Sequence, residues 1–353
     1  MHECRNFRQH EYHIILAPNL AAQIDISVFP DYFTFHLIKK RPASNLINFL
    51  VMMLWYRAFE RRIKPDCIIS TGGHGYWKPK VPVVGGFNIP HYVYPESPYF
   101  RNLSLKKRVY WKFMRLIHLH LYNRLDAVLV QTEDVKLRLS RILSSGAPIH
   151  VISNTASAHF FSKSSFLAKL PARVHGETRL LTLSSYYPHK NLEVINRVTQ
   201  IFKERGEARF KFILTLPDEQ YRLAFGTNDT GLIFNTGPVP IRECPSLYDE
   251  CDIMFLPTLL ECFSASYAEA MVMKKPILTS DMSFARTVCL NAAVYFNPLD
   301  PEEIAGKISE LAGDSELQNR LINEGESIAR NFNTPYERAD TFLKICQEVL
   351  ELH

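Results

Sequence analysis

The 353-residue sequence lacks the cysteine pattern of a disulfide-rich or zinc-binding protein. Its seven cysteines are odd in number and scattered, and none forms a CxxC pair. Structural zinc sites and small secreted domains depend on paired or clustered cysteines. The cysteines therefore indicate reduced thiols in a cytosolic setting and argue against a zinc site or a disulfide framework.

The sequence also has no apolar run long enough to span a membrane. The longest candidate, residues 46–55, is about half of the roughly 20 residues that a transmembrane helix needs, and three arginines follow it closely. We interpret this run as a buried helix. The first 20 residues lack a basic region followed by an apolar region and a cleavage site, so secretion is not indicated.

Length and local composition predict two domains. The chain exceeds the roughly 100 to 200 residues of a usual single core, and its hydrophobic content of 46% is ordinary for a globular protein. A polar passage over residues 157–176 interrupts the pattern, and we place a linker there. We predict domains over residues 1–165 and 166–334, and an amphipathic helix over 335–353. Strand and helix patterns alternate in the second domain, as in parallel α/β proteins.

Charge is divided unevenly between these domains. Residues 1–165 hold 22 Lys and Arg against 10 Asp and Glu, a net charge of +12, so the remainder carries −7 of the total +5. Much of the positive charge lies in residues 101–116, where it interleaves with Tyr110, Trp111 and Phe113. This pattern suits peripheral contact with an anionic membrane, and the alternative is a solvated face on a helix that packs through its aromatic residues. Nucleic acid is not expected as a partner, because no helix-turn-helix, zinc-finger or RNP-like pattern is present.

The most informative segment, residues 256–271, contains two glutamates eight positions apart. A short buried strand over 252–256 is stopped by Pro257, and residues 264–273 are rich in helix formers. Such a junction opens a cleft at the carboxyl end of a parallel strand, where open α/β sheets bind ligands. Backbone N–H groups near Phe263 and Ser264 suit an anion, and Glu261 and Glu269 can accept hydrogen bonds from sugar hydroxyls.

A simpler interpretation of the same segment stays open. Ser266 and Glu269 also match a capping box, in which Glu269 only reaches back to the start of its helix, and Glu261 can be a solvated loop residue. Cys262 lies between them, but no base is assigned near it, so we do not expect it to act as a nucleophile.

The segment resembles the family 4 glycosyltransferases of the GT-B fold. The resemblance rests on a Glu, seven residues, a second Glu, then Ala-Met and a strand led by Lys275-Pro276. It implies two Rossmann-like domains facing a cleft and a retaining transfer of a sugar from a nucleoside-diphosphate-sugar donor to a hydroxyl acceptor. It further implies that neither a metal nor a cofactor is required. A carbohydrate or lipid-linked acceptor in cell-surface polysaccharide or glycolipid synthesis is the expected setting, in the cytoplasm or at the inner membrane face.

The resemblance also assigns donor-binding roles. A strand over 180–184 and a helix that begins near Asn191 match the first strand of the family's nucleotide-binding domain. Lys190 falls on the family's diphosphate-binding lysine, and Ser185 falls where an arginine is usual. Glu261 would hold a sugar hydroxyl and Glu269 the ribose. Without this context, Lys190 would be interpreted as a surface charge.

Candidate residues of the first domain follow the strand over 81–87. Family members often carry a histidine at the end of this strand that faces the donor sugar, and the alignment puts Asn88 there, with His91 three residues later. A structural role for His91 is the alternative.

The N-terminus departs from the family. Residues 10–17 look like the family's second strand, and residues 1–9 contain no Gly. The resemblance therefore implies a first domain that lacks its opening strand-loop-helix unit. Two other functions remain open: a non-catalytic nucleotide-sugar-binding or assembly protein, and a different GT-B activity such as an epimerase or a phosphorylase.

Overall fold

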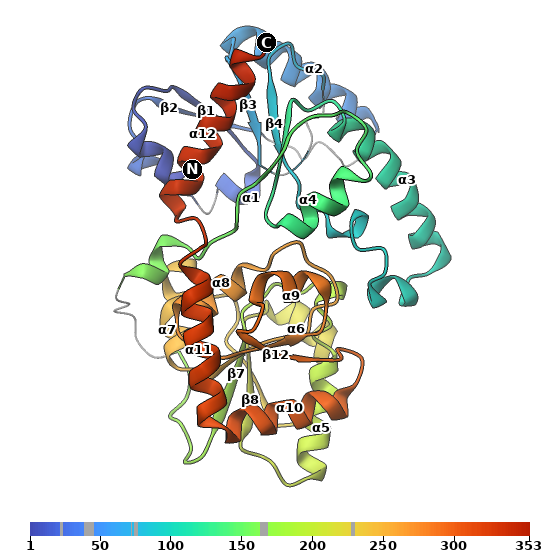
Figure 1. Ribbon diagram of the computed structural model, residues 1–353, viewed down its shortest axis with the longest axis vertical. Coiled ribbons are helices and arrows are strands. Elements are labelled where there is room, and N and C mark those ends of the chain that lie inside the picture. The colour runs from blue at the N-terminus through green and yellow to red at the C-terminus, as the bar shows by residue number, and fades with distance from the viewer. Residues whose placement is uncertain (22–23, 39–45, 72, 74–76, 163–168, 227–229) are drawn as a thin grey trace.

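A computed structural model describes the chain except residues 22–23, 39–45, 72, 74–76, 163–168 and 227–229. Two α/β units lie one above the other along the long axis, and the helices lie outside the strands (Figure 1). The boundary predicted between residues 165 and 166 falls outside the described residues. No helix among the described residues is long and apolar enough to cross a membrane.

The C-terminal unit is built on a six-stranded, fully parallel sheet. Its strands are β7 (Thr178–Thr182), β8 (Phe210–Leu214), β9 (Ile233–Asn235), β10 (Ile253–Leu256), β11 (Ile277–Ser280) and β12 (Ala293–Phe296). Their spatial order is β12-β11-β10-β7-β8-β9. The order reverses between β7 and β10, and a ligand crevice in an open parallel sheet lies at this kind of switch point, beyond the carboxyl ends of the strands.

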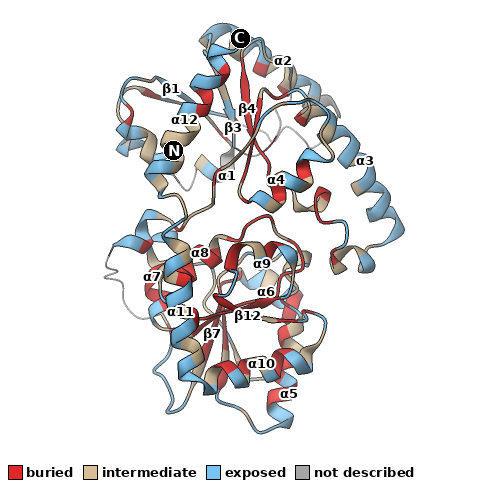
Figure 2. Ribbon diagram, viewed as in Figure 1, coloured by how far each residue is buried: buried red, intermediate tan, exposed pale blue. Residues whose placement is uncertain are grey.

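Helices cover both faces of this sheet, because parallel strands are apolar on both sides. One hydrophobic cluster joins the sheet to α5 (Val194–Glu204) and α10 (Pro301–Gly313), and another joins it to α8 (Ala265–Val272) and α9 (Ser283–Cys289). Figure 2 shows these strands as the buried centre of the unit. The remaining helices are α6 (Asp218–Phe225), α7 (Cys244–Asp249) and α11 (Ser315–Ala329).

The N-terminal unit divides its strands between two parallel sheets. One sheet pairs β1 (Tyr12–Leu16) with β2 (Phe33–Leu37), and the other has the order β3-β4-β5-β6. The bounds of the latter strands are Ile68–Ser70, Val83–Gly86, Ala127–Val130 and Ile149–Val151. The central strands β4 and β5 are buried throughout, whereas Ile69 on β3 is exposed. In the part of the chain that the structure describes, no ladder joins the two sheets.

The helices of this unit are α1 (Pro18–Ala21), α2 (Leu46–Ile63), α3 (Leu105–Tyr122) and α4 (Glu133–Ser140). The segment predicted as a buried helix, 46–55, is helical, but the part of it whose burial the structure describes, 50–55, is not buried throughout. Met52 and Tyr56 are buried, but Leu50, Val51 and Leu54 are exposed. Among the described side chains of α2, Met52 and Tyr56 pack in a small cluster with Ile38, and Leu50, Val51 and Leu54 lie outside it.

The last helix, α12 (Pro335–Glu351), lies on the N-terminal unit (Figure 1). Ile345, Cys346 and Val349 pack against Val84 and neighbouring residues of β4 and β5. The chain therefore crosses twice between the units. The two crossing segments are bonded to each other, since Ser153 N donates to Asn333 Oδ1 at 3.1 Å and Asn333 N donates to Ser153 Oγ at 2.8 Å.

Candidate active site

Lys190 and Glu261 meet beyond the carboxyl ends of β7 and β10. Lys190 ends the 3₁₀ helix Pro188–Lys190, which follows β7, and Glu261 lies in the loop after β10. The Lys190 ammonium forms an ion pair with the Glu261 carboxylate, and each side chain is only 14% exposed. Because β7 and β10 are neighbours in the sheet, residues 71 positions apart are brought together at the switch point.

Backbone contacts hold this ion pair in place. The carbonyl of His189 accepts hydrogen bonds from the Leu259 amide at 2.7 Å and from the Thr258 hydroxyl at 3.2 Å. The Thr258 hydroxyl also lies 3.3 Å from Glu261 Oε1. The interpretations of Lys190 as a surface charge and of Glu261 as a solvated loop residue are therefore wrong, because the two loops are bonded together around a largely buried pair.

Glu269 lies on α8 and is buried, with 8% of its surface exposed. Tyr248 Oη donates to Glu269 Oε2 at 3.3 Å. Burial raises the pKa of the Glu269 carboxyl from 4.5 to about 7, and the Tyr248 hydrogen bond lowers it to a smaller extent. The capping-box interpretation is wrong. Ser264 begins the helix without a side-chain cap, and the Ser266 hydroxyl donates to the Leu183 carbonyl instead.

The other donor-side candidates differ in exposure. Ser185 is exposed beyond the end of β7, so a larger side chain fits there. Ser264 is buried at the start of α8, and Phe263 packs edge-on against Phe332. Only the backbone of Phe263 is therefore suited to a ligand. Burial raises the pKa of the Cys262 thiol well above its ordinary value, so Cys262 stays protonated.

His91 of the N-terminal unit reaches the same region. It lies in the 3₁₀ helix Pro90–Tyr92, stacks on Trp111 with ring centres 3.9 Å apart, and meets His189 edge-on at 5.8 Å. Its Nδ1 is buried without a hydrogen-bond partner among the described residues. Burial, with a smaller contribution from His189, lowers the pKa of His91 to about 4, so the ring is neutral at physiological pH. Asn88 is exposed just beyond β4.

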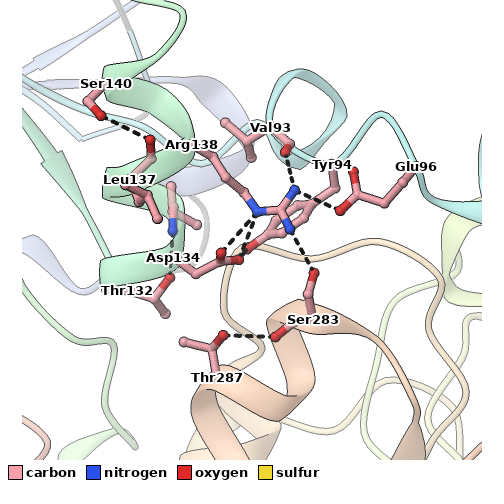
Figure 3. Close-up of polar contacts among 11 residues, drawn as sticks. Val93, Tyr94, Glu96, Thr132, Asp134, Leu137, Arg138, Ser140, Ser283 and Thr287 are labelled. Atoms are coloured by element: carbon pink, nitrogen blue, oxygen red, sulfur yellow. Dashed lines mark hydrogen bonds and ion pairs between the residues drawn. The ribbon is translucent and has the colours of Figure 1, made fainter.

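Two further contacts join the units beside the site. The buried Ser97 hydroxyl donates to the Leu259 carbonyl at 2.7 Å. Arg138 on α4 donates to Ser283 Oγ at the start of α9, at 3.3 Å, as Figure 3 shows. The same guanidinium also bonds Asp134 at 3.0 Å and Glu96 at 2.7 Å.

Sequence reasoning missed several of these residues. Gln131 directly follows the buried strand β5, and its position at a strand end could have identified it. Its amide N–H donates to the Phe87 carbonyl at 3.2 Å, and its Oε1 is buried without a partner in the described structure. Tyr248, His189 and Arg138 gave no signal, because their partners are distant in sequence. Among the described residues, no three His, Cys, Asp or Glu side chains form a group suited to a metal ion.

Comparisons with known proteins agree with this geometry. Residues 168–328 match the model of the family "Glycosyl transferases group 1", and this range contains β7, β10 and the Lys190–Glu261 pair. No curated protein matches the chain in sequence.

Solved structures establish the fold as that of the GT-B glycosyltransferases. A sucrose-phosphate synthase from Thermosynechococcus elongatus superimposes with a TM-score of 0.76 at 12% identity, covering 99% of this chain and 92% of that one. WaaG, a glycosyltransferase involved in lipopolysaccharide biosynthesis, gives 0.69 at 12% identity, covering 97% and 92%. A TarM variant from S. aureus, in complex with fondaparinux, α-GlcNAc-glycerol and UDP, gives 0.60 at 14% identity, covering 86% and 59%. The fold class predicted from the sequence is therefore confirmed.

Proposed function

We propose that the protein is a retaining glycosyltransferase that moves a sugar from a nucleoside diphosphate donor to a hydroxyl acceptor. The observation that carries the proposal is the Lys190–Glu261 pair at the switch point between β7 and β10. A lysine ammonium has three N–H donors, and Glu261 uses one of them, which leaves others for phosphate oxygens. The family match over residues 168–328 and the UDP in the TarM structure support a nucleotide site here.

Each donor-side residue has a role in this reaction. Lys190 and the uncapped start of α8 would stabilise the negative charge that develops on the departing diphosphate. Glu261 holds Lys190 in place and accepts a hydrogen bond from the transferred sugar. Glu269, with its pKa near 7, holds a ribose hydroxyl.

The acceptor side belongs to the N-terminal unit. His91 and Asn88 face the transferred sugar, and Nδ1 of the neutral His91 ring, which has no partner among the described residues, can bond a hydroxyl. The acceptor hydroxyl attacks on the face that the diphosphate leaves and passes its proton to that group, so the step needs neither a dedicated protein base nor a metal. A carbohydrate or lipid-linked acceptor suits the basic N-terminal half.

Titration calorimetry tests the nucleotide site. The wild-type chain should bind a nucleoside diphosphate, and Lys190→Ala should weaken binding by about 10-fold to 100-fold, since a charged hydrogen bond contributes about 1.5 to 3 kcal/mol. Lys307→Ala is the matched control, because Lys307 also pairs with a glutamate, Glu310, but on the surface of the same unit. Equal affinity of both variants would refute the assigned site.

Turnover assays with nucleotide sugars test the reaction itself. Glu261→Ala should mainly lower kcat, because Glu261 contacts the reacting sugar, whereas Glu269→Ala should mainly weaken nucleotide binding. One observation favours a second candidate: Ser185 leaves the diphosphate without the arginine that the resemblance predicts. Tight nucleotide-sugar binding without transfer or donor hydrolysis would establish a non-catalytic binder. Conversion of the donor sugar without an acceptor would indicate an epimerase.

A further inference from the structure

The outward face of α3 is apolar, although it faces solvent. Leu105, Val109, Phe113 and Leu116 are exposed by 78%, 59%, 60% and 70%. Their spacing of four, four and three residues places them on one side of the helix. Figure 2 shows α3 as an exposed helix at the edge of the N-terminal unit, away from α12.

The opposite face fixes α3 to the protein. Tyr122 is fully buried, and Trp111 is half-buried and stacks on His91. His118 Nδ1 shares a hydrogen bond of 2.8 Å with the Tyr92 hydroxyl. Ser104 caps the helix by accepting from the Lys107 amide. Among the residues that the structure describes, α3 is therefore anchored through one side, and its apolar outer side is left exposed.

Cations border the apolar face. Arg108, Lys112 and Arg115 are spaced four and three residues apart and form the row beside it, and Lys106 and Lys107 lie in the first turn. Residues 101–122 contain no Asp or Glu, and the whole segment 1–165 carries +12. The partner that complements this surface is both anionic and apolar.

A bilayer that contains anionic lipids has both properties. Helices that lie at a membrane interface combine Lys and Arg with exposed Leu, Phe and Trp in this way. A second copy of this chain is a poorer partner, because an isologous contact through the same face brings the two rows of cations together. A nucleic acid would leave the apolar row without a partner.

We propose that α3 docks on an anionic membrane surface. Leu105, Val109, Phe113 and Leu116 enter the boundary between headgroups and acyl chains, and the flanking cations contact lipid phosphates. The same helix carries Trp111 against His91, so docking places the N-terminal side of the site beside the membrane. This inference rests on the exposed surface alone and is independent of the reaction proposed above.

Co-sedimentation of the full chain with vesicles tests the proposal. One set of vesicles is pure phosphatidylcholine, and the other also contains about 30% phosphatidylglycerol, which is anionic. Each basic residue near an anionic surface contributes about 1 kcal/mol, or about five-fold in binding. The wild type should bind the anionic vesicles at least about ten-fold better, and moderate salt should weaken this binding.

Two α3 variants and a matched control separate the charge from the apolar face. A charge variant replaces the five cations of α3 with Gln, and an apolar variant replaces its four exposed apolar residues with Ser. Each should lose binding at least about ten-fold. Both sets are exposed, and circular dichroism and thermal melting check that the fold is kept. The control makes the same charge change in the C-terminal unit, with Gln at Arg197, Lys203, Arg209, Arg222 and Arg320, and should bind like the wild type.

Insertion has its own readout. In a Phe113→Trp variant, brominated lipids should quench the added tryptophan fluorescence in anionic vesicles and not in neutral ones. Equal binding to neutral and anionic vesicles, or wild-type binding by either α3 variant, would overturn the proposal. Dimers in sedimentation velocity that the apolar variant loses would assign this face to a second copy of the chain instead.

Discussion

Replacing Glu269 with Gln should change how the stability of the protein depends on pH. The carboxyl is buried on α8 with the Tyr248 hydroxyl as its hydrogen-bond partner, and burial raises its pKa from 4.5 to about 7. Because the folded pKa is the higher one, the folded chain binds more protons than the unfolded chain between about pH 4.5 and 7. Stability is therefore lost as the pH rises through this window.

The size of the effect follows from the two pKa values. The two pKa values differ by about 2.5, and each pKa unit corresponds to about 1.4 kcal/mol. Ionisation of Glu269 should therefore make the free energy of unfolding of the wild type about 3 kcal/mol lower above pH 7 than below pH 4.5. Gln has no proton to lose, and its amide oxygen can still accept from Tyr248. The variant should match the wild type near pH 4 and exceed its stability by about 3 kcal/mol near pH 8.

Urea unfolding at a series of pH values measures this difference. The free energy of unfolding of Glu269→Gln, minus that of the wild type, should rise from pH 4 to about pH 7 and level off towards pH 8 at constant ionic strength. Glu324→Gln makes the same chemical change at an exposed position of α11 and should show no such rise. A difference that stays constant with pH would refute the burial argument for Glu269.

Three further changes test other parts of the structure. Ser185→Arg should tighten nucleoside diphosphate binding by about ten-fold at low salt, because the exposed position can receive an arginine that pairs bidentately with phosphate. Calorimetry measures the affinity, and an unchanged value would remove Ser185 from the diphosphate site. Arg138→Gln should lower the free energy of unfolding by about 1.5 to 3 kcal/mol and increase the radius of gyration in small-angle scattering. The control Arg286→Gln removes an ion pair and a ring contact within the C-terminal unit and should leave the radius of gyration unchanged. Scattering of Arg138→Gln identical to that of the wild type would exclude a role in holding the units together. Transferase activity should survive a metal chelator, and its complete loss, restored by a divalent cation, would contradict the metal-independent mechanism.

The sequence predicts well what is local. The strand over 252–256, the helix after it and the position of Lys190 before a helix all follow from residue patterns within about ten positions. The spacing of Glu261 and Glu269 pointed to the junction between β10 and α8, where Glu261 meets Lys190. The burial of α2 was predicted wrongly because it is not a local property. Composition predicts a helix there, but tertiary packing decides that Leu54 is exposed.

Other features depend on contacts across long sequence separations. Lys190 reaches Glu261 because β7 and β10 are neighbours in the sheet, and no local pattern specifies that pairing. The bonds of Tyr248 to Glu269 and of Arg138 to Ser283 likewise join different helices, and in the latter case different units. The burial of Glu269, and hence its raised pKa, likewise results from packing against residues distant in sequence, such as Tyr248.

The bonded pair of Ser153 and Asn333 limits how the two units can move. Both covalent crossings pass through one point, so the units can turn about a single joint but cannot easily slide past one another. In Figure 1 the crossings lie on the left, while α4 and α9, which carry Arg138 and Ser283, lie to their right. The Arg138 contact thus sits away from the pivot, where a small rotation produces a larger displacement. Opening should therefore begin by breaking this contact, while the pivot remains bonded.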